Sequence, residues 1–285
     1  MGKLRFTKMQ GTGNDYVYVN LTEETVSKPE ELARRISDRR FGVGGDGLVL
    51  IDKSDQADLS MRMFNADGSE SEMCGNAIRC VAKYGFEHGL VTKSELTVHT
   101  LAGIKQIELK EDDWGRVDMV RVNMGVPELS AKLIPAQMDR APAIDHIFQI
   151  EGQEIRGTLV NMGNPHFVTF VQDIQTAPVT TLGPIIENYE LFPNRINIEF
   201  VQVLSPTHAL QRTWERGSGE TLACGTGASA ALVAGVLTNR LENLATIELT
   251  GGKLHIEWPG EGSSLFMSGP AVEVFSGEFD ERSIV

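Results

Sequence analysis

The chain has 285 residues, and its contents of 41% hydrophobic and 23% charged residues are typical of a soluble globular protein. That length exceeds one ordinary core and suits two domains of roughly 100–150 residues each. The formal net charge of −13 repels nucleic-acid phosphates and anionic lipids, so binding to either is excluded as a main role.

The sequence also bears on the compartment in which the protein works. No apolar run approaches the roughly 18 residues of a membrane span, and the first sixteen residues lack the apolar stretch of a signal peptide. Three cysteines, an odd number, favour a reducing compartment over a disulfide framework. We therefore expect a cytoplasmic protein.

Short strands dominate the predicted elements. In the first half, alternation predicts strands at residues 16–19, 47–51, 59–64 and 104–109. The phrase Ser27-Lys28-Pro29-Glu30 has capping-box spacing and predicts a helix to about Arg39, and a second helix follows Cys74. In the second half we expect strands at 166–171, 196–201 and 209–214, and a helix from Ala228 to about Leu237.

The last of these helices is almost wholly small and apolar, which predicts that strands enclose it on all sides. We expect an α+β fold of two pseudo-symmetric halves, each a curved, mostly antiparallel sheet around a central helix. The helix N-termini should meet at the interface of the halves. The predicted halves are residues 1–124 with 270–285, which carry Cys74, and residues 125–269, which carry Cys224.

A repeat at one fixed offset indicates a duplicated unit. Met73-Cys74-Gly75-Asn76-Ala77 and Ala223-Cys224-Gly225-Thr226-Gly227 are separated by 224 − 74 = 150 residues. The same offset relates further identical or similar positions: Gly13-Asn14 to Gly163-Asn164, Arg62 to Arg212, Phe64 to Trp214, Glu70 to Glu220 and Gly85 to Gly235. Each copy thus presents one Cys-Gly at the start of a helix.

A cysteine in the first turn of a helix is near the positive end of the helix dipole and near unpaired N–H groups, both of which favour the thiolate. Two such thiols suit a racemase or epimerase, in which one takes a proton from a carbon and the other returns a proton to the opposite face. The amides of Gly75, Asn76, Gly225 and Thr226 would form a cradle for a carboxylate. Cys80, on an apolar helix face, is expected to be a small buried hydrophobic residue.

Seven phrases in order, from residue 4 to about 275, resemble the diaminopimelate epimerase family. They are Gly13-Asn14-Asp15, Phe64-Asn65-Ala66-Asp67-Gly68-Ser69, Met73-Cys74-Gly75-Asn76, Gly163-Asn164-Pro165-His166, Arg195-Ile196-Asn197-Ile198-Glu199-Phe200, Trp214-Glu215-Arg216-Gly217 and Ala223-Cys224-Gly225-Thr226-Gly227. The resemblance implies that family's fold and a pyridoxal-phosphate-independent, two-thiol interconversion of LL- and meso-diaminopimelate, for lysine and peptidoglycan precursor synthesis.

The resemblance also assigns roles by position. Cys74 and Cys224 match the acid–base pair, and His166 and Glu215 match residues that tune the thiols. Matches to substrate-binding residues are Asn14, Asn65, Gly75, Asn76, Asn164, Asn197, Glu215, Arg216, Gly225 and Thr226, with Arg216 gripping the distal carboxylate. It implies no cofactor and a homodimer, although Phe275 stands where some relatives have a tyrosine linked to dimer formation.

Three other functions compete with this interpretation. A proline or hydroxyproline racemase of the same superfamily typically has histidine after the first Cys-Gly, where this chain has Asn76. A thiol redox protein would use Cys74 and Cys224 without a Cys-x-x-Cys motif. A non-catalytic anion-binding module would need the helix ends alone. A zinc site is not expected, since the three cysteines lack ligand spacing.

Overall fold

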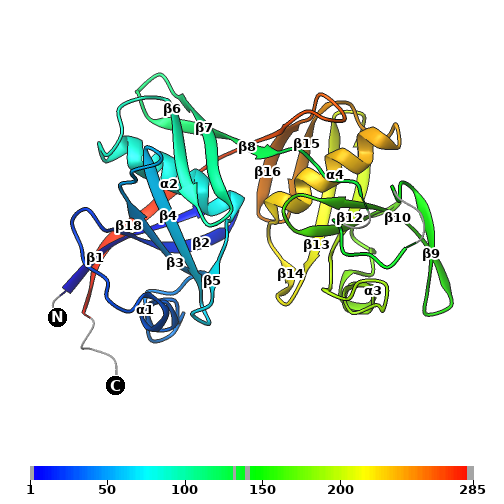
Figure 1. Cartoon of the computed structure of the whole chain (residues 1–285), viewed down its shortest axis with the longest axis horizontal. Helices are drawn as coiled ribbons and strands as arrows, with labels where there is room; N and C mark the ends of the chain where they lie inside the picture. The colour runs from blue at the N-terminus through cyan, green and yellow to red at the C-terminus, as the bar shows by residue number, and fades with distance from the viewer. Residues whose placement is uncertain (1–2, 131–132, 139–141, 281–285) are drawn as a thin grey trace. The chain divides into compact units, whose positions relative to one another are not determined.

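Residue contacts divide the computed structural model, which describes residues 3–130, 133–138 and 142–280, into two units (Figure 1). Unit 1 comprises Met1–Val122 and Gly269–Val285, and unit 2 comprises Asn123–Ser268. The two boundaries fall inside strands β8 (Val117–Gly125) and β17 (Leu265–Gly269). Unit 1 is therefore built from both ends of the chain, whereas unit 2 is one continuous stretch.

Unit 1 is a mixed sheet with two helices. Its elements are β1 (Lys3–Gly11), β2 (Asn14–Asn20), α1 (Pro29–Ile36), β3 (Gly47–Asp52), β4 (Leu59–Asn65), β5 (Glu70–Ser71), α2 (Gly75–Glu87), β6 (Glu95–Thr100), β7 (Gly103–Glu111), most of β8, and β18 (Val272–Asp280). Most strand pairs are antiparallel, but β2–β3 and β4–β6 are parallel.

Unit 2 repeats this arrangement. Its elements are β9 (His146–Ile150), β10 (Gln153–Asn161), β11 (Pro165–Phe170), α3 (Val179–Glu187), β12 (Asn197–Ser205), β13 (His208–Glu215), β14 (Gly219–Thr221), α4 (Gly225–Leu237), β15 (Leu244–Leu249), β16 (Gly252–Glu257) and β17. The parallel pairs are β11–β12 and β13–β15, at the positions that β2–β3 and β4–β6 occupy in unit 1.

Strand register confirms the predicted duplication residue by residue. Tyr16 pairs with Gly47 in unit 1, and His166 pairs with Asn197 in unit 2, so both partners are shifted by 150. Ion pairs between equivalent residues repeat as well. Arg62–Glu70 and Arg212–Glu220 each have an N···O distance of 2.7 Å.

One helix in each unit is enclosed by the sheet, as predicted. Helix α2 packs against β1, β2, β4, β6, β7 and β18, and α4 packs against β10, β11, β12, β15 and β16 (Figure 1). Residues 227–235 of α4 are all buried, which explains their apolar sequence. The helix begins at Gly225, three residues before the predicted start, because Cys224 is the extended residue that caps it.

Helices α1 and α3 form a second layer on the other face of each sheet. In unit 1, Leu32, Ala33 and Ile36 of α1 pack with apolar residues of β1, β2 and β3. In unit 2, Val179 and Ile186 of α3 join a core that includes Phe148, Phe167 and Phe200. Helix α3 was not among the predicted elements.

The prediction for α1 was wrong at both ends. Its N-cap is Lys28, and no side chain caps it, so Ser27 does not form a capping box. The helix ends at Ile36 and not near Arg39, because the main-chain amides of Val43 and Gly44 donate to the Ile36 carbonyl at 2.9 and 3.0 Å. The loop thus satisfies the last helical carbonyls.

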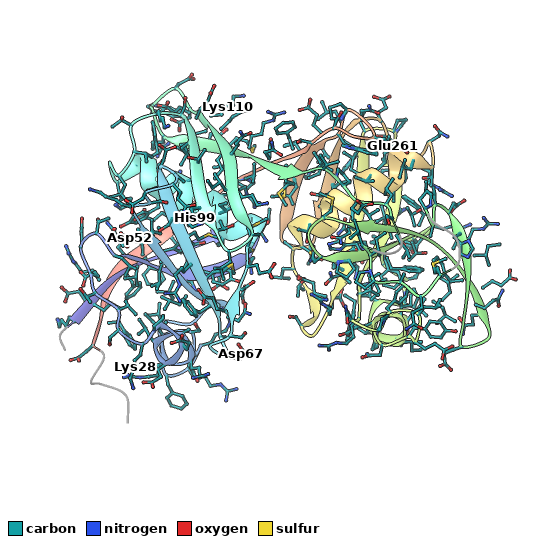
Figure 2. The ribbon with its side chains drawn as sticks, in the orientation of Figure 1. Lys28, Asp52, Asp67, His99, Lys110 and Glu261 are labelled. Atoms are coloured by element: carbon teal, nitrogen blue, oxygen red, sulfur yellow. The ribbon has the colours of Figure 1, made fainter. Side chains whose placement is uncertain are left out.

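Charged side chains cover the outside of the units. Lys28 at the start of α1 and Lys110 on β7 are both exposed (Figure 2). Within the described residues, none of the helices has the length and apolar character needed to cross a membrane.

Candidate active site

Cys74 directly precedes α2 and is its N-cap, with an extended backbone. Its thiol is partly exposed and donates to the Asn14 Oδ1 atom at 3.4 Å. Ile78 is the first residue whose N–H bonds back along the helix, to the Cys74 carbonyl at 2.9 Å. The N–H groups of Gly75 and Asn76 belong to the first turn, where a helix offers donors to an anion.

Two of the predicted amides surround Cys74. Asn14 accepts from the thiol, and its Nδ2 atom donates to Asp46 at 2.7 Å. Asn76 is buried beneath the helix start, and Thr12 donates to its Oδ1 atom at 3.2 Å. Asn65 lies at the end of β4 and donates to the Ser69 hydroxyl at 3.0 Å, within its own turn. Unit 1 therefore brings Asn14 and Asn76 to Cys74.

Cys80 is fully buried on α2, as predicted. Burial raises the pKa of this thiol to about 11, in opposition to the hydrogen bond from Tyr18 and the charge of Arg79. A thiol in that environment stays protonated and packs as an apolar side chain.

Cys224 is likewise the extended N-cap residue of its helix, α4, but it is buried. Its sulfur accepts from the Gly227 N–H at 3.4 Å and lies 3.4 Å from the Thr226 hydroxyl oxygen. Burial and the carboxylates of Glu215 and Glu199 nevertheless raise the pKa of Cys224 well above the ordinary thiol value. The helix start alone predicts the opposite direction, and in unit 2 desolvation and negative charge outweigh it.

A buried polar cluster lies behind Cys224. His166 on β11 is fully buried, with Nδ1 at 2.8 Å from Glu199 Oε1 and Nε2 at 2.9 Å from Asn164 Oδ1. Glu215 ends β13 and accepts from the Thr221 hydroxyl. Burial raises the pKa of Glu215, with a further contribution from Glu199. Unit 2 thus places Glu215 next to Cys224, and His166 and Asn164 join the same polar cluster through Glu199 and through each other.

Glu199 is a member of this cluster that the sequence analysis did not single out as a site residue. It is fully buried on β12, and its Oε1 atom would lie 2.6 Å from a Cβ atom on Gly227. The same added Cβ would lie 3.2 Å from the Cβ atom of Cys224. Glycine at 227 is therefore what lets the carboxylate approach the thiol.

Asn197 and Arg216 form a separate group in unit 2. The Asn197 amide donates to the Pro165 carbonyl at 2.8 Å and accepts from the Arg216 N–H at 2.9 Å. The Arg216 side chain is exposed, with one guanidinium nitrogen at 3.1 Å from the Asn194 carbonyl. Buried Glu187 on α3 orders the same loop by accepting from Trp214 at 2.7 Å and from the Gly217 N–H at 2.9 Å. Glu187 was not among the predicted site residues.

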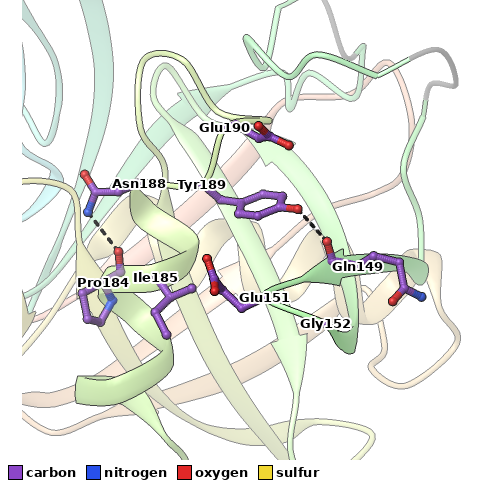
Figure 3. Close-up of a pocket in the computed structure, with 8 residues that line it drawn as sticks. All are labelled: Gln149, Glu151, Gly152, Pro184, Ile185, Asn188, Tyr189 and Glu190. Carbon is purple, nitrogen blue, oxygen red and sulfur yellow. Dashed lines mark hydrogen bonds between the residues drawn. The ribbon is translucent and has the colours of Figure 1, made fainter.

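A cavity of about 600 Å³ in unit 2 contains none of these residues. It lies between the β9–β10 turn and the end of α3, where Tyr189 donates to the Gln149 carbonyl at 2.7 Å (Figure 3). Within residues 3–130, 133–138 and 142–280, no group of three or more His, Cys, Asp or Glu side chains is arranged to hold a metal ion.

Comparison with known proteins agrees with the motifs. The sequence profile of the family "Diaminopimelate epimerase" matches residues 6–130 and 158–274. A diaminopimelate epimerase of Acetivibrio thermocellus is 53% identical over 277 residues, covering 97% of this chain and 99% of its own. That of Moorella thermoacetica is 52% identical with the same coverage of both chains.

Solved structures share the fold at low sequence identity. A probable proline racemase from Agrobacterium radiobacter K84 superposes with a TM-score of 0.70 at 15% identity, covering 98% of this chain and 93% of its own. A phenazine biosynthesis protein of the PhzF family from Bacillus anthracis gives 0.67 at 17% identity, covering 98% and 99%. These likenesses show the fold alone. The profile match and the near-full-length relatives show that this chain belongs to the diaminopimelate epimerase family.

Proposed function

We propose that this protein is an isomerase that interconverts LL- and meso-diaminopimelate by proton transfer at the α-carbon, a step of lysine biosynthesis. The observation that carries the proposal is the pair of Cys-Gly helix starts, which repeat at an offset of 150 residues within a duplicated fold. Identity above 50% to two diaminopimelate epimerases over nearly the whole chain supports the choice of substrate.

In the proposed reaction, Cys74 and Cys224 act as the two bases. One sulfur, as a thiolate, takes the α-proton, and the electron pair of the C–H bond stays on the substrate as a carbanion. The other sulfur, as a thiol, then donates its proton to the opposite face of the same carbon. Each turnover leaves the protonation of the two sulfurs exchanged, which is the starting state for the reverse direction.

Main-chain amides supply the electrostatic stabilisation in this proposal. The first-turn N–H groups at Gly75, Asn76, Gly225 and Thr226 would hold the α-carboxylate, over which negative charge spreads as the proton leaves. Asn14, Asn65, Asn164 and Asn197 would bind or position the remaining polar groups. His166 and Glu215 would tune the thiol of Cys224, to which the buried cluster of unit 2 is adjacent.

Arg216 is proposed to recognise the distal end of the substrate. Its guanidinium is exposed, while its main chain is fixed by Asn197 at 2.9 Å, so the side chain projects from an ordered loop. A guanidinium pairs with a carboxylate through two parallel hydrogen bonds. Such a residue fits a substrate with a second charged end, which proline lacks.

Isotope exchange tests the proposal against the proline or hydroxyproline racemase alternative. The purified protein in deuterium oxide should incorporate deuterium at the α-carbon of diaminopimelate, and not of proline or hydroxyproline, by mass spectrometry. Cys74→Ser and Cys224→Ser should each abolish epimerisation, and Cys80→Ser should keep most activity. Normal epimerisation by either of the first two variants would exclude the two-base mechanism.

We also propose a homodimer, in which β18 contributes the contact surface. Val272, Val274 and Phe275 on this strand are large apolar side chains with 41%, 55% and 48% of their surface exposed. Clustered apolar residues on one exposed strand are characteristic of an association surface. Phe275 also packs edge-on against Phe6, with ring centroids 5.9 Å apart, which holds its ring in place.

A further inference from the structure

Arg79 is a cation buried inside unit 1, with 0% of its surface exposed. It lies on α2, five residues after Cys74. Its Nη1 atom donates to the Gly75 carbonyl at 3.0 Å, and its Nε atom donates to the Pro270 carbonyl at 3.2 Å. Its Nη2 atom donates to Asn76 Oδ1 at 3.0 Å and to the Thr12 hydroxyl at 3.4 Å. These four acceptors are neutral groups, and together they orient the guanidinium.

These contacts order the residues that adjoin the thiol. Gly75 and Asn76 directly follow Cys74, and Thr12 belongs to the turn that leads into Asn14, the acceptor of the Cys74 thiol. Asn76 Oδ1 accepts from both Arg79 and Thr12, so its amide is held with the oxygen toward the guanidinium. The buried Arg79 side chain thus forms hydrogen bonds both to the first turn of α2 and to the turn before β2.

Unit 2 has the same architecture, but the buried charged side chains near its cysteine have the opposite sign. At the position equivalent to Arg79 it has Ser229, whose hydroxyl donates to the Gly225 carbonyl at 2.9 Å. That bond repeats the Arg79–Gly75 contact without a charge. Conversely, unit 1 has Val49 and Asn65 where unit 2 has Glu199 and Glu215. A cation therefore lies near Cys74, and two carboxyl groups lie near Cys224.

We propose, as an extension of the proposed function, that Arg79 is a positioning residue whose buried charge stabilises the ionised sulfur of Cys74. Charges interact more strongly in the interior than in water, because the effective dielectric constant is lower there. Burial lowers the pKa of Arg79, and the thiols of Cys80 and Cys74 and the Tyr18 phenol oppose that effect. Cys74 is then the sulfur that ionises at the lower pH of the two.

The other titratable groups around α2 leave this contrast in place. Tyr16 and Tyr18 on β2 and Cys80 are buried, and burial raises the pKa of the Tyr18 phenol and of the Cys80 thiol. Beyond Asn14, Asp15 pairs with Lys8 and Arg39, each at 2.6 Å, and Asp46 pairs with Arg39 at 2.9 Å. Helix α2 also packs against β4, β6, β7 and β18. Every titratable side chain on these four strands is at least partly exposed. Water therefore screens them.

Alkylation by iodoacetamide at a series of pH values tests the inference, because only the thiolate reacts. Cys74 would be followed in the Cys224→Ser protein and Cys224 in the Cys74→Ser protein, with peptide mass spectrometry to separate Cys80. We expect the pH at which half of the thiol is reactive to be lower for Cys74 than for Cys224. This comparison leaves Arg79 intact, so it does not depend on how substitutions at 79 fold. A midpoint for Cys224 equal to or below that of Cys74 would overturn the inference.

Substitution of Arg79 then separates charge from packing. Arg79→Gln should raise the pH at which half of Cys74 is reactive, its alkylation midpoint, by about one pH unit or more. Arg79→Lys keeps the positive charge, so its midpoint should stay close to that of the native residue. Arg62→Gln removes a surface cation of unit 1 and is the matched control, with no shift expected. If Arg79→Gln and Arg79→Lys shifted the Cys74 midpoint equally, or if Arg79→Gln did not shift it, the proposed role of the charge would be rejected. Alkylation needs no substrate, so it answers this question even if the protein failed to epimerise diaminopimelate.

Discussion

Glu215 ends β13 next to Cys224, where burial raises the pKa of its carboxyl group. A carboxyl group whose folded-state pKa is raised contributes stability in full below its unfolded pKa, and this contribution is lost as pH rises through the folded value. At neutral and alkaline pH the ionised group therefore lowers the stability of unit 2. Glu215 therefore destabilises the fold at the pH at which the proposed reaction uses it to tune Cys224.

Replacing Glu215 by glutamine should remove the loss of stability that its ionisation causes, and should also lower the epimerisation activity. The amide can still accept from the Thr221 hydroxyl but cannot ionise. We expect calorimetry to show a higher melting temperature for Glu215→Gln than for the native protein at pH 8, with the difference shrinking toward pH 4. Epimerisation should fall by about tenfold or more. Glu220→Gln, at the partly exposed ion pair with Arg212, is the control, and an equal pH-dependent gain there would refute the explanation.

The sequence reveals the residues of this site that carry a local signature and hides those that depend on distant partners. Cys74 and Cys224 stand at recognisable helix starts, and His166 and Glu215 occur in family phrases. Glu199 lies inside one of these phrases but was given no role, and Glu187 and Arg79 look like ordinary helix residues. Their importance arises from burial and from partners such as His166, 33 positions away, and Pro270, 191 positions away. No short pattern encodes those contacts.

At the scale of elements, helices α2 and α4 occupy equivalent places but differ in how closely their neighbours pack. Gly85 and Gly235 are equivalent positions. A Cβ atom on Gly85 would lie 2.4 Å from the terminal Cδ1 of Leu59 and at least 3.6 Å from the next atoms. On Gly235 it would lie 2.5, 2.7 and 2.8 Å from three atoms of Leu241, including its Cβ. The first crowding is relieved by a small side-chain rotation, whereas the second requires the backbone to shift.

The two glycines should therefore respond differently to alanine. Alanine favours a helix over glycine by roughly 0.5–1 kcal/mol, which offsets a small clash. We expect Gly85→Ala to change the free energy of unfolding by less than about 1 kcal/mol, and Gly235→Ala to lower it by about 1–3 kcal/mol. Urea denaturation followed by circular dichroism compares the pair, each serving as the control for the other. A larger loss for Gly85→Ala would contradict the packing argument.

Elements with regular patterns were predictable, and those held by tertiary contacts were not. The seven predicted strands correspond to β2, β3, β4, β7, β11, β12 and β13, and the apolar sequence of α4 predicted its burial, whereas strands such as β1 and β18 were not predicted. Helix α3 has Pro184 inside it and Gly183 near its middle, which both disfavour a helix. It forms because Val179 and Ile186 enter the core of unit 2, and because Gly183 lets Trp214 approach to within 2.7 Å of where a Cβ would lie.

At the scale of the whole molecule, the exposed side chains of β18 give the proposed dimer a direct test. Val274→Asp places a charge in the surface that the dimer would bury, where it lacks water and a partner. Analytical ultracentrifugation at micromolar concentration should show a dimer for the native protein and a monomer for this variant. Ile104→Asp changes a residue of β7 that is 48% exposed, similar to the 55% of Val274, and should remain dimeric. A monomeric native protein would rule out the proposal.

The pairing of β1 with β18 has a consequence for the order of folding during synthesis. These strands join Lys3 to Asp280, so β1 waits for β18, whereas unit 2 is complete once residue 268 is made. We expect a chain stopped at residue 268 to protect unit 2 from protease while residues 3–122 are cut, and equal protection of both would disprove this order. The N-terminal half is then the later one to fold, which inverts the usual sequence on the ribosome. A chain released soon after residue 268 would have a finished unit 2 but an unfinished Cys74 half, and that half would be open to degradation.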